Sequence, residues 1–264
     1  MRLVFWNIRA GGGIRGGAIA RQIDAWGADT VALCEFRGTS SSLELARTLR
    51  SLGLIYQCTT ADPARPTVNA ILLASRWPLR RARLACAPIE PCRWLLARLL
   101  APTPLTVGVM HVPNRVSGRK YPYLDAVLTT ARRAWPGPAL FLGDTNSGRI
   151  DLDEQVPAFN RIEDAWMRGL DGAGWTDAFR HLRGTRRAYT WYSPNGRNGF
   201  RIDQAFLNEA LRPHLRAFRY DWGGRDRPPS DHAAMVLDFA SRAAMAAVRG
   251  PGRPASGWPP GRRA

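Results

Sequence analysis

Short apolar runs, each bounded by polar residues or by Gly and Pro, recur along most of the chain. Runs of about four to eight such residues are typical of buried strands. The pattern predicts strands at residues 3–8, 30–36, 54–59, 68–74, 93–100, 105–112, 139–142, 201–207 and 233–239. Apolar positions recur at helical spacing in three further segments, 18–26, 42–52 and 121–135. The mixture predicts an α/β fold.

Two local signals refine this prediction. Ser41 and Glu44 have the spacing of a capping box at the start of the second predicted helix, and Gly53 is placed to end it. Strand 68–74 is followed after a short turn by a second strand-like segment, 79–85, and such a connection predicts an antiparallel pair. We therefore expect mixed sheets with both antiparallel pairs and helical crossovers.

Composition divides the chain into two parts. The apolar content of 45% is ample for one large domain, which we expect to span residues 1–240. Residues 241–264 are dominated by Ala, Gly, Pro and Arg, and they cannot bury enough apolar surface to offset the entropy lost on ordering. We expect this basic segment to be a disordered tail.

The formal net charge of +17 bears directly on function. A field of this size attracts polyanions and makes their binding depend on salt, so nucleic acid or an anionic membrane surface is the expected partner. Lys120 is the only lysine among 38 basic residues, which indicates a coding bias toward Arg. Such a bias does not account for the deficit of acidic residues.

Nothing in the sequence indicates export or membrane insertion. The four cysteines, at positions 34, 58, 86 and 92, form no Cys-x-x-Cys pair, and we expect them to be reduced. The N-terminus enters a strand without a basic and then apolar leader, and no apolar run reaches the length of a membrane span. We expect a soluble, cytoplasmic protein that does not bind membranes and is a monomer.

A glycine pattern near the N-terminus offers an alternative reading. Gly-x-Gly-x-x-Gly at residues 11–16 follows a strand, opens a helix and precedes Glu35 at the end of the next strand, as in a dinucleotide-binding unit. Asn7 and Arg9 separate the strand from the first glycine, and the pattern leaves the later polar clusters unexplained. We interpret the glycines as a flexible loop.

Six polar clusters stand at the predicted strand ends: Asn7-Ile8-Arg9, Glu35-Phe36-Arg37, His111-Val112-Pro113-Asn114, Gly143-Asp144-Thr145-Asn146, Arg201-Ile202-Asp203 and Ser230-Asp231-His232. Carboxylate, carboxamide and imidazole groups at the ends of neighbouring strands can converge on one phosphate, which metal-assisted phosphoryl hydrolysis requires. The amide oxygen of Asn7 and the carboxylate of Glu35 are hard ligands suited to Mg²⁺ or Mn²⁺.

Two of these clusters suggest paired roles. Asp144 and Asn146 are two residues apart and are expected to point to the same side, so that one orients water and the other holds phosphate, while Gly143 allows a close backbone approach. Asp203 bonded to His232 would fix the imidazole tautomer and stabilise its protonated form.

This ordered set of motifs resembles the endonuclease/exonuclease/phosphatase superfamily, which includes deoxyribonuclease I, exonuclease III and the abasic-site endonucleases. The resemblance spans residues 3–239. It implies an α/β sandwich of two sheets, mixed and mostly antiparallel, flanked by helices, with the site at one end of the sheets. It also implies a hydrolase that acts on phosphodiester bonds.

The resemblance implies a role for each cluster. It implies a catalytic group of Asp144, Asn146, His232, Asp203 and His111. It implies metal-site residues Glu35, Asn7 and Asp231, the last of which could instead support the histidine. It implies substrate contacts by Arg9, Arg37, Asn114, Trp191, Phe200 and Arg201. The aromatic pair Trp191 and Phe200 could line a pocket for a flipped sugar or belong to the core, and the sequence leaves both open.

Features of two branches occur together. Arg9, Arg37 and His111 are similar to deoxyribonuclease I, whereas Asn114 and the aromatic pair resemble the abasic-site enzymes. Asn69 stands where deoxyribonuclease I has the glutamate that orients its leaving-group histidine, so we expect His111 to be a weaker acid or a phosphate ligand.

We therefore expect a phosphodiesterase that depends on Mg²⁺ or Mn²⁺ and hydrolyses nucleic acid, with DNA as the expected substrate. A phosphatase or phosphodiesterase of small anionic substrates, such as phosphoinositides, is the alternative on the same fold. A nucleic-acid-binding module without activity is disfavoured, because the set of site residues is nearly complete.

Overall fold

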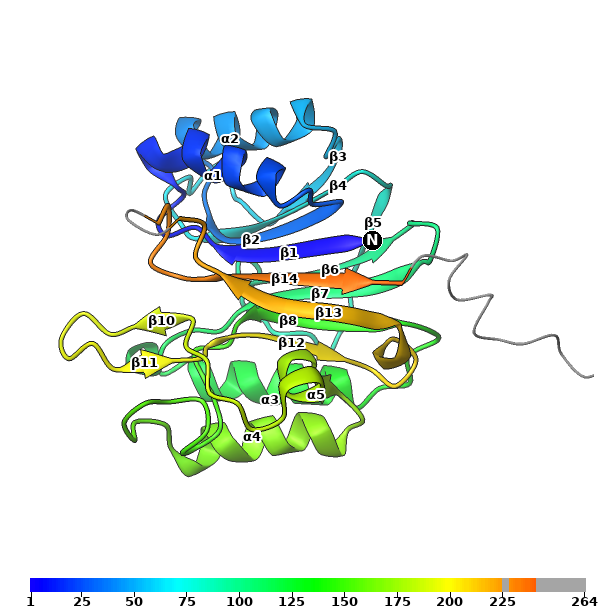
Figure 1. Cartoon of the computed structure of the whole chain (residues 1–264). Helices are drawn as coiled ribbons and strands as arrows, with labels where there is room; N and C mark the ends of the chain where they lie inside the picture. The colour runs from blue at the N-terminus through cyan, green and yellow to red at the C-terminus, as the bar shows by residue number, and fades with distance from the viewer. Residues whose placement is uncertain (225–227, 241–264) are drawn as a thin grey trace, which may run out of the picture.

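The structure is a computed structural model that describes residues 1–224 and 228–240, so the predicted tail at 241–264 lies outside the described residues. Two six-stranded sheets face each other (Figure 1). The order in the first sheet is β13 (Leu215–Asp221), β14 (Ala234–Phe239), β1 (Arg2–Asn7), β2 (Thr30–Phe36), β4 (Ala70–Ser75) and β3 (Tyr56–Thr59). The order in the second is β5 (Leu79–Ala82), β6 (Trp94–Leu99), β7 (Leu105–His111), β8 (Ala139–Asp144), β12 (Asp203–Leu207) and β9 (Thr176–Asp177).

Each sheet is mixed. The pairs β1–β2 and β7–β8 are parallel, and the other strand pairs are antiparallel. Long helices cover the outer faces of the sandwich, and one of them lies between the two strands of each parallel pair along the chain (Figure 1). They are α1 (Gly16–Ala25), α2 (Ser40–Ser51), α3 (Lys120–Ala131) and α4 (Arg161–Gly172), and the short helix is α5 (Ala178–Arg183). A separate hairpin consists of β10 (Trp191–Tyr192) and β11 (Gly199–Phe200).

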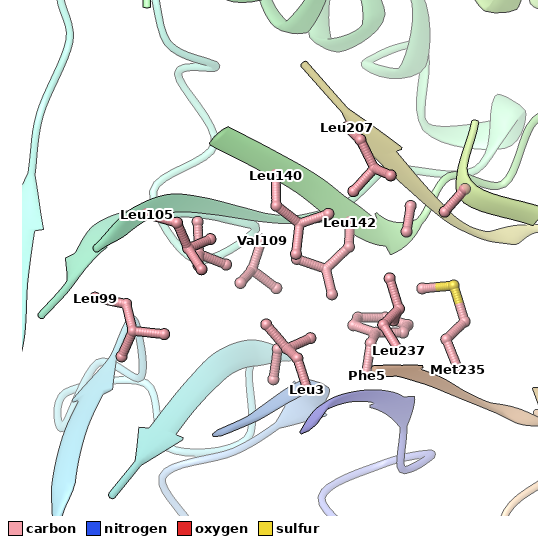
Figure 2. Close-up of a cluster of buried hydrophobic side chains, with 14 of the residues drawn as sticks. Leu3, Phe5, Leu99, Leu105, Val109, Leu140, Leu142, Leu207, Met235 and Leu237 are labelled. Carbon is pink, nitrogen blue, oxygen red and sulfur yellow. The ribbon is translucent and has the colours of Figure 1, made fainter. Parts of the chain in front are cut away.

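The main core fills the space between the sheets. Figure 2 shows Leu3 and Phe5 of β1 facing Leu140 and Leu142 of β8 across this space. The intervening side chain Val4 packs on the outer face under the helices. Because both faces of these strands are covered, the sequence shows continuous apolar runs and not an alternation of apolar and polar positions. The packing confirms the predicted two-sheet sandwich.

One predicted hairpin is wrong. β4 pairs with β2 and β3 in the first sheet, whereas β5 pairs with β6 in the second. Both edges of β4 are already occupied, so the chain must leave that sheet after Ser75. The short connection therefore crosses from one sheet to the other.

Helix ends and an edge strand also differ from the predictions. The capping box predicted at Ser41 is absent from α2, whose N-cap is Thr39, and Glu44 instead forms an ion pair with Arg47. A capping box does begin α4, where Asn160 accepts from the N–H of Glu163. That helix was not predicted, and neither was β13, an edge strand whose bulge breaks the alternating pattern.

The remaining structural predictions concern cysteines and membranes. All four cysteines are free thiols, as expected. Among the described helices, none combines the length and the apolar character that crossing a bilayer would need.

Candidate active site

The polar clusters converge where strand ends of the two sheets meet, on the left in Figure 1, at the arrowhead of β1. Asn7, the last residue of β1, donates from Nδ2 to Oδ2 of Asp144 at 3.0 Å and to Oε1 of Glu35 at 3.4 Å. Since Asp144 ends β8 in the opposite sheet, this side-chain amide joins the two sheets. Residues more than one hundred positions apart thereby form one site.

Gly143 is needed for this convergence. A Cβ atom built at this position would lie 1.9 Å from the carbonyl oxygen of Met110 on the neighbouring strand. Only glycine permits so close an approach of β7 and β8, which sets His111 opposite Asp144 in the register. The prediction that Gly143 allows a close backbone approach is confirmed.

Asp144, Asp203 and His232 form the buried centre of the site. One ligand atom from each lies within 4.8 Å of the others, and Asp203 faces Asp144 in the register of β12 and β8. Nδ1 of His232 is 2.9 Å from Oδ2 of Asp203. The predicted pairing of Asp203 with His232 is therefore present.

Two pKa values in this centre are shifted in ways that suit chemistry near neutral pH. Burial lowers the pKa of His232, but the charge and hydrogen bond of Asp203, with the charges of Asp144 and Asp231, raise it to about 9. Burial, with the charge of Asp203, raises the pKa of Asp144 to about 7, although the charge of His232 and hydrogen bonds from Asn146 and Asn7 oppose it.

Asn146 reaches Asp144 by a turn and not by strand alternation. Its φ of 44° is left-handed, and its N–H donates to Oδ1 of Asp144 at 3.0 Å. Nδ2 of Asn146 donates to the carbonyl of Val112 at 2.8 Å, and Nζ of Lys120 donates to the carbonyl of Asn146 at 2.5 Å. Lys120 is buried beside Glu163, with which it forms an ion pair. The pair Asp144 and Asn146 is together as predicted, but the turn holds it.

The donor set fits a hard divalent cation. Glu35, Asp144 and Asp203 bring carboxylates to the site, and Oδ1 of Asp203 is a buried oxygen without a hydrogen-bond partner in the described part of the chain. Asn7 turns its nitrogen toward the carboxylates while its Oδ1 accepts from the N–H of Arg9 at 3.0 Å, so ligation through oxygen would require the amide to turn over. Asp231 lies farther out and is 3.8 Å from Nε of Arg9.

His111 is in the site, but none of the described carboxylates lies within hydrogen-bonding distance of its imidazole. Its Nε2 is 3.9 Å from Oδ2 of Asp144, and its buried Nδ1 has no hydrogen-bond partner among the described residues. Burial and the positive charges of Arg93 and His232 hold its pKa well below the ordinary value. Asn69 accepts from Nε of Arg37 at 2.7 Å and does not orient the imidazole.

A cavity of about 150 Å³ adjoins Asn146. Its lining includes two basic side chains and three aromatic rings, namely Arg115, Lys120, Phe159, Trp191 and Phe200. Asn114 also lines it. Trp191 and Phe200 thus line a cavity and are not core residues, and their role as a pocket for a flipped sugar stays a prediction. Phe159 was not predicted, since the loop that carries it has no motif.

The prediction that Arg201 contacts substrate is wrong. Its side chain is completely buried and donates from Nε to Asp153 at 2.7 Å and from Nη2 to Asp177 at 2.6 Å. A completely buried guanidinium that is engaged by the buried carboxylate of Asp153 and the half-buried carboxylate of Asp177 cannot reach a phosphate. The hydroxyl of Tyr220, 3.4 Å from Arg201, donates to the carbonyl of Asp203 at 2.8 Å. Arg201 therefore supports the strand that carries Asp203.

Fold and site together define a class: a two-sheet sandwich whose strand ends gather two buried carboxylates and a protonated histidine is built for phosphoester hydrolysis. Residues 4–232 match the model of the Endonuclease/Exonuclease/phosphatase family. The chain belongs to this family and is a hydrolase of phosphoester bonds. No curated protein sequence matches it.

Solved structures with the same fold include a phosphatase bound to DNA and two nucleases. The 3′ phosphatase NExo from Neisseria bound to a product DNA hairpin has a TM-score of 0.73 and 20% identity, covering 91% of this chain and 99% of that one. The 3′–5′ exonuclease NExo from Neisseria meningitidis has a TM-score of 0.72 and 21% identity, covering 90% and 99%. An AP endonuclease from Archaeoglobus fulgidus has a TM-score of 0.76 and 18% identity, also covering 90% and 99%.

Proposed function

We propose that this chain is a divalent-metal-dependent nuclease that hydrolyses phosphodiester bonds of DNA. The observation that carries the proposal is the buried cluster of Asp144, Asp203 and His232, which Asn7 joins to Glu35. Glu35 is the residue that would hold Mg²⁺ or Mn²⁺, with Asn7 if its amide turns over and with Asp231 at the outer edge of the site. When bound, the ion would stabilise negative charge that develops on the scissile phosphate.

The side chains of the site suit an in-line attack by water. Asp144, whose pKa is raised to about 7, can accept a proton from water near neutral pH. The N–H of Asn146 holds Oδ1 of Asp144, and one N–H of its Nδ2 is bonded to the carbonyl of Val112. The second N–H of Nδ2 and the Oδ1 of Asn146 would therefore orient the water or the phosphate. His232 is held protonated by Asp203 and offers a charged hydrogen bond to a phosphoryl oxygen.

His111 has a different role in this proposal. Because its pKa is lowered, the imidazole is neutral and serves as a hydrogen-bond donor or phosphate ligand, not as a strong acid. Arg9 is well exposed at the edge of the site and is placed to contact the DNA backbone. Arg37 is engaged by Asn69 and would contribute its remaining N–H groups.

The cavity beside Asn146 supports a substrate whose sugar leaves the helix. Phe159, Trp191 and Phe200 offer apolar faces to this cavity, and Lys120 and Arg115, which share Glu163 as an ion-pair partner, are its basic lining residues. Such a cavity suits the sugar of a 3′ end or of an abasic site. The DNA in the related 3′ phosphatase structure and the abasic-site activity named for the archaeal neighbour support this choice.

The test compares four substrates with and without EDTA: a plasmid, a duplex with a 3′ phosphate, a duplex with an abasic site, and a soluble inositol phosphate. We expect metal-dependent cleavage of at least one DNA and a steep loss of DNA binding with salt. Cleavage of the inositol phosphate without cleavage of DNA would instead support the phosphatase alternative.

A further inference from the structure

Two arginines face each other at the edge of the second sheet. Arg80 of the edge strand β5 and Arg98 of β6 are partners in the antiparallel register, and both residues are exposed. Like charges directly opposite each other on neighbouring strands destabilise the pairing of those strands. In the described part of the chain, no carboxylate forms an ion pair with either guanidinium. This arginine pair therefore carries an electrostatic cost that the protein by itself does not offset.

The chain around the arginine pair has very few acidic residues. Between Ser75 and Asp125 the sequence has nine basic residues and a single acid, Glu90. Glu90 is already engaged, because its carboxylate lies 3.2 Å from Arg119. Arg83, which follows β5, is exposed and likewise has no acidic partner among the described residues. A bound anion would neutralise this charge, and two facing guanidinium groups match the oxygens of a phosphate.

A cavity of about 350 Å³ adjoins the arginine pair on the same face of the sheet. Ala82 and Leu96 form a cross-strand pair two residues farther along β5 and β6, so they share this face with the arginines at a spacing of about 7 Å. Both line the cavity, and so does Arg83. The face therefore joins a positive site for an anion to a hollow with apolar walls.

The walls of this cavity suit a flat apolar group. Trp94 lines it and is held in place by an edge contact with Phe141, at 5.4 Å between ring centroids. Pro88 and Pro91 line it as well and restrict the backbone of their loop. The volume falls in the range of sites for small organic ligands, whereas the cavity beside Asn146, at about 150 Å³, is smaller.

The loop that forms much of the cavity is fixed at both ends. Oγ1 of Thr130 in α3 donates to the carbonyl of Cys86 at 3.1 Å. Oγ1 of Thr60, which follows β3 in the first sheet, donates to the carbonyl of Cys92 at 2.7 Å. Since the cavity is already formed in the free protein, little conformational entropy would be lost on binding.

We infer that this face binds one nucleotide of an unpaired nucleic-acid strand, with its phosphate between Arg80 and Arg98 and its base in the adjoining cavity. The inference rests on the proposed function and names single-stranded segments of the DNA as the ligand. A base can enter a cavity only when it is not paired within a duplex. The strand can come from the catalytic site, because Trp94 follows Arg93, whose carbonyl accepts from the N–H of His111 at 3.0 Å.

The experiment measures binding of labelled DNA to the full chain by fluorescence anisotropy in EDTA, so that cleavage does not interfere. The probes are a blunt duplex, the same duplex with a single-stranded overhang at its 3′ or 5′ end, and the same overhangs with abasic linkers that keep the phosphates but lack the bases. One variant combines Arg80→Gln with Arg98→Gln. The matched control combines Arg21→Gln with Arg216→Gln, which removes two exposed arginines from α1 and β13 of the other sheet.

A second variant, Ala87→Phe, tests the cavity without changing the charge, because Ala87 is one of its lining residues. Circular dichroism and thermal melting verify that each variant is folded. The Phe side chain would occupy the place of the base, so this variant should bind normal and abasic overhangs equally.

We expect wild-type protein to bind one of the two normal overhangs about tenfold more tightly than its abasic counterpart, as for the stacking of one base. The Arg80 and Arg98 double variant should lose about tenfold on that overhang, and its salt slope should fall by about 0.7, as for one phosphate contact. Its binding of the blunt duplex should equal that of the control variant.

Three results would overturn the inference. They are equal binding of normal and abasic overhangs by wild-type protein, a loss in the double variant that matches the control, and equal losses on blunt and overhang duplexes. The last two would assign the arginines to a general attraction for polyanions. Cleavage is measured separately with Mg²⁺, and wild-type protein that prefers the overhang but cleaves no DNA would refute the proposed function while leaving this binding site intact.

Discussion

Asp203→Asn isolates the electrostatic role of the dyad. The substitution keeps the size of the side chain but removes the charge that holds His232 protonated at 2.9 Å. The difference between a pKa of about 9 and the ordinary 6.5 corresponds to about 3 kcal/mol of stabilisation of the imidazolium. Without the carboxylate, burial dominates and the pKa of His232 should fall below 6.5. At about pH 7.5 less than about a tenth of the histidine would then be protonated.

The assay is the pH profile of kcat/KM on DNA at saturating Mg²⁺. Asp144 must be ionised and His232 protonated, so the wild-type profile should rise toward about 7 and fall above about 9, although the ion would move the lower limb downward. In the variant the alkaline limb should move below 6.5, and activity at about pH 7.5 should fall by about tenfold or more, in proportion to the protonated fraction of His232.

Two results would refute this reasoning. One is a wild-type His232 that titrates below 7 by NMR in the metal-free protein, where the carboxylates are present without the ion. The other is a variant whose alkaline limb does not move while its activity falls. Asp24→Asn, an exposed change on α1, is the control for a general effect of lost negative charge.

Three further predictions use the same geometry. Asp144→Asn should abolish activity but raise the Tm of the metal-free protein at about pH 8. Because the pKa of Asp144 is raised in the folded protein, the wild type loses stability as the pH rises from 3.8 through about 7. Thermal melts at several pH values should show that this loss is smaller in the variant. Gly143→Ala should lower the free energy of unfolding by about 3 kcal/mol or more, because its Cβ would lie 1.9 Å from the carbonyl oxygen of Met110. Denaturant titration measures this free energy, and a smaller loss would mean that β7 and β8 can separate enough to admit the Cβ. Arg201→Met should destabilise the fold by at most about 3–5 kcal/mol, because Asp153 loses one of its two guanidinium partners and keeps only Arg180. A folded variant with normal stability and a raised KM would restore the substrate role.

Much of the site could be predicted from the order of the polar clusters. Asn7, Asp144 and His232 end or adjoin apolar strands, and in the structure they meet as the pattern indicates. The metal-ligand role of Glu35 was inferred from residue type alone and stays a prediction. The convergence of the clusters was predicted correctly because strand ends in a sheet lie at one edge, so position in the chain already constrains position in space.

The roles of other residues depended on contacts that no local pattern encodes. Arg201 lies next to a motif residue, yet two distant carboxylates, Asp153 and Asp177, bury it. Asn69 bonds Arg37 instead of orienting His111. Each outcome depends on which side chains the fold brings within hydrogen-bonding distance, and these partners are far apart in the sequence.

The apolar strands, the mixed α/β class, the phosphoester chemistry and the positive field could all be inferred from the chain, because these follow from residue type and local spacing. That β4 and β5 belong to different sheets, that Trp191 and Phe200 line a cavity and that Asp153 and Asp177 engage Arg201 became known from the fold. Pairing partners, cavities and surfaces arise from packing between distant segments, and neither periodicity nor composition specifies which segments will meet.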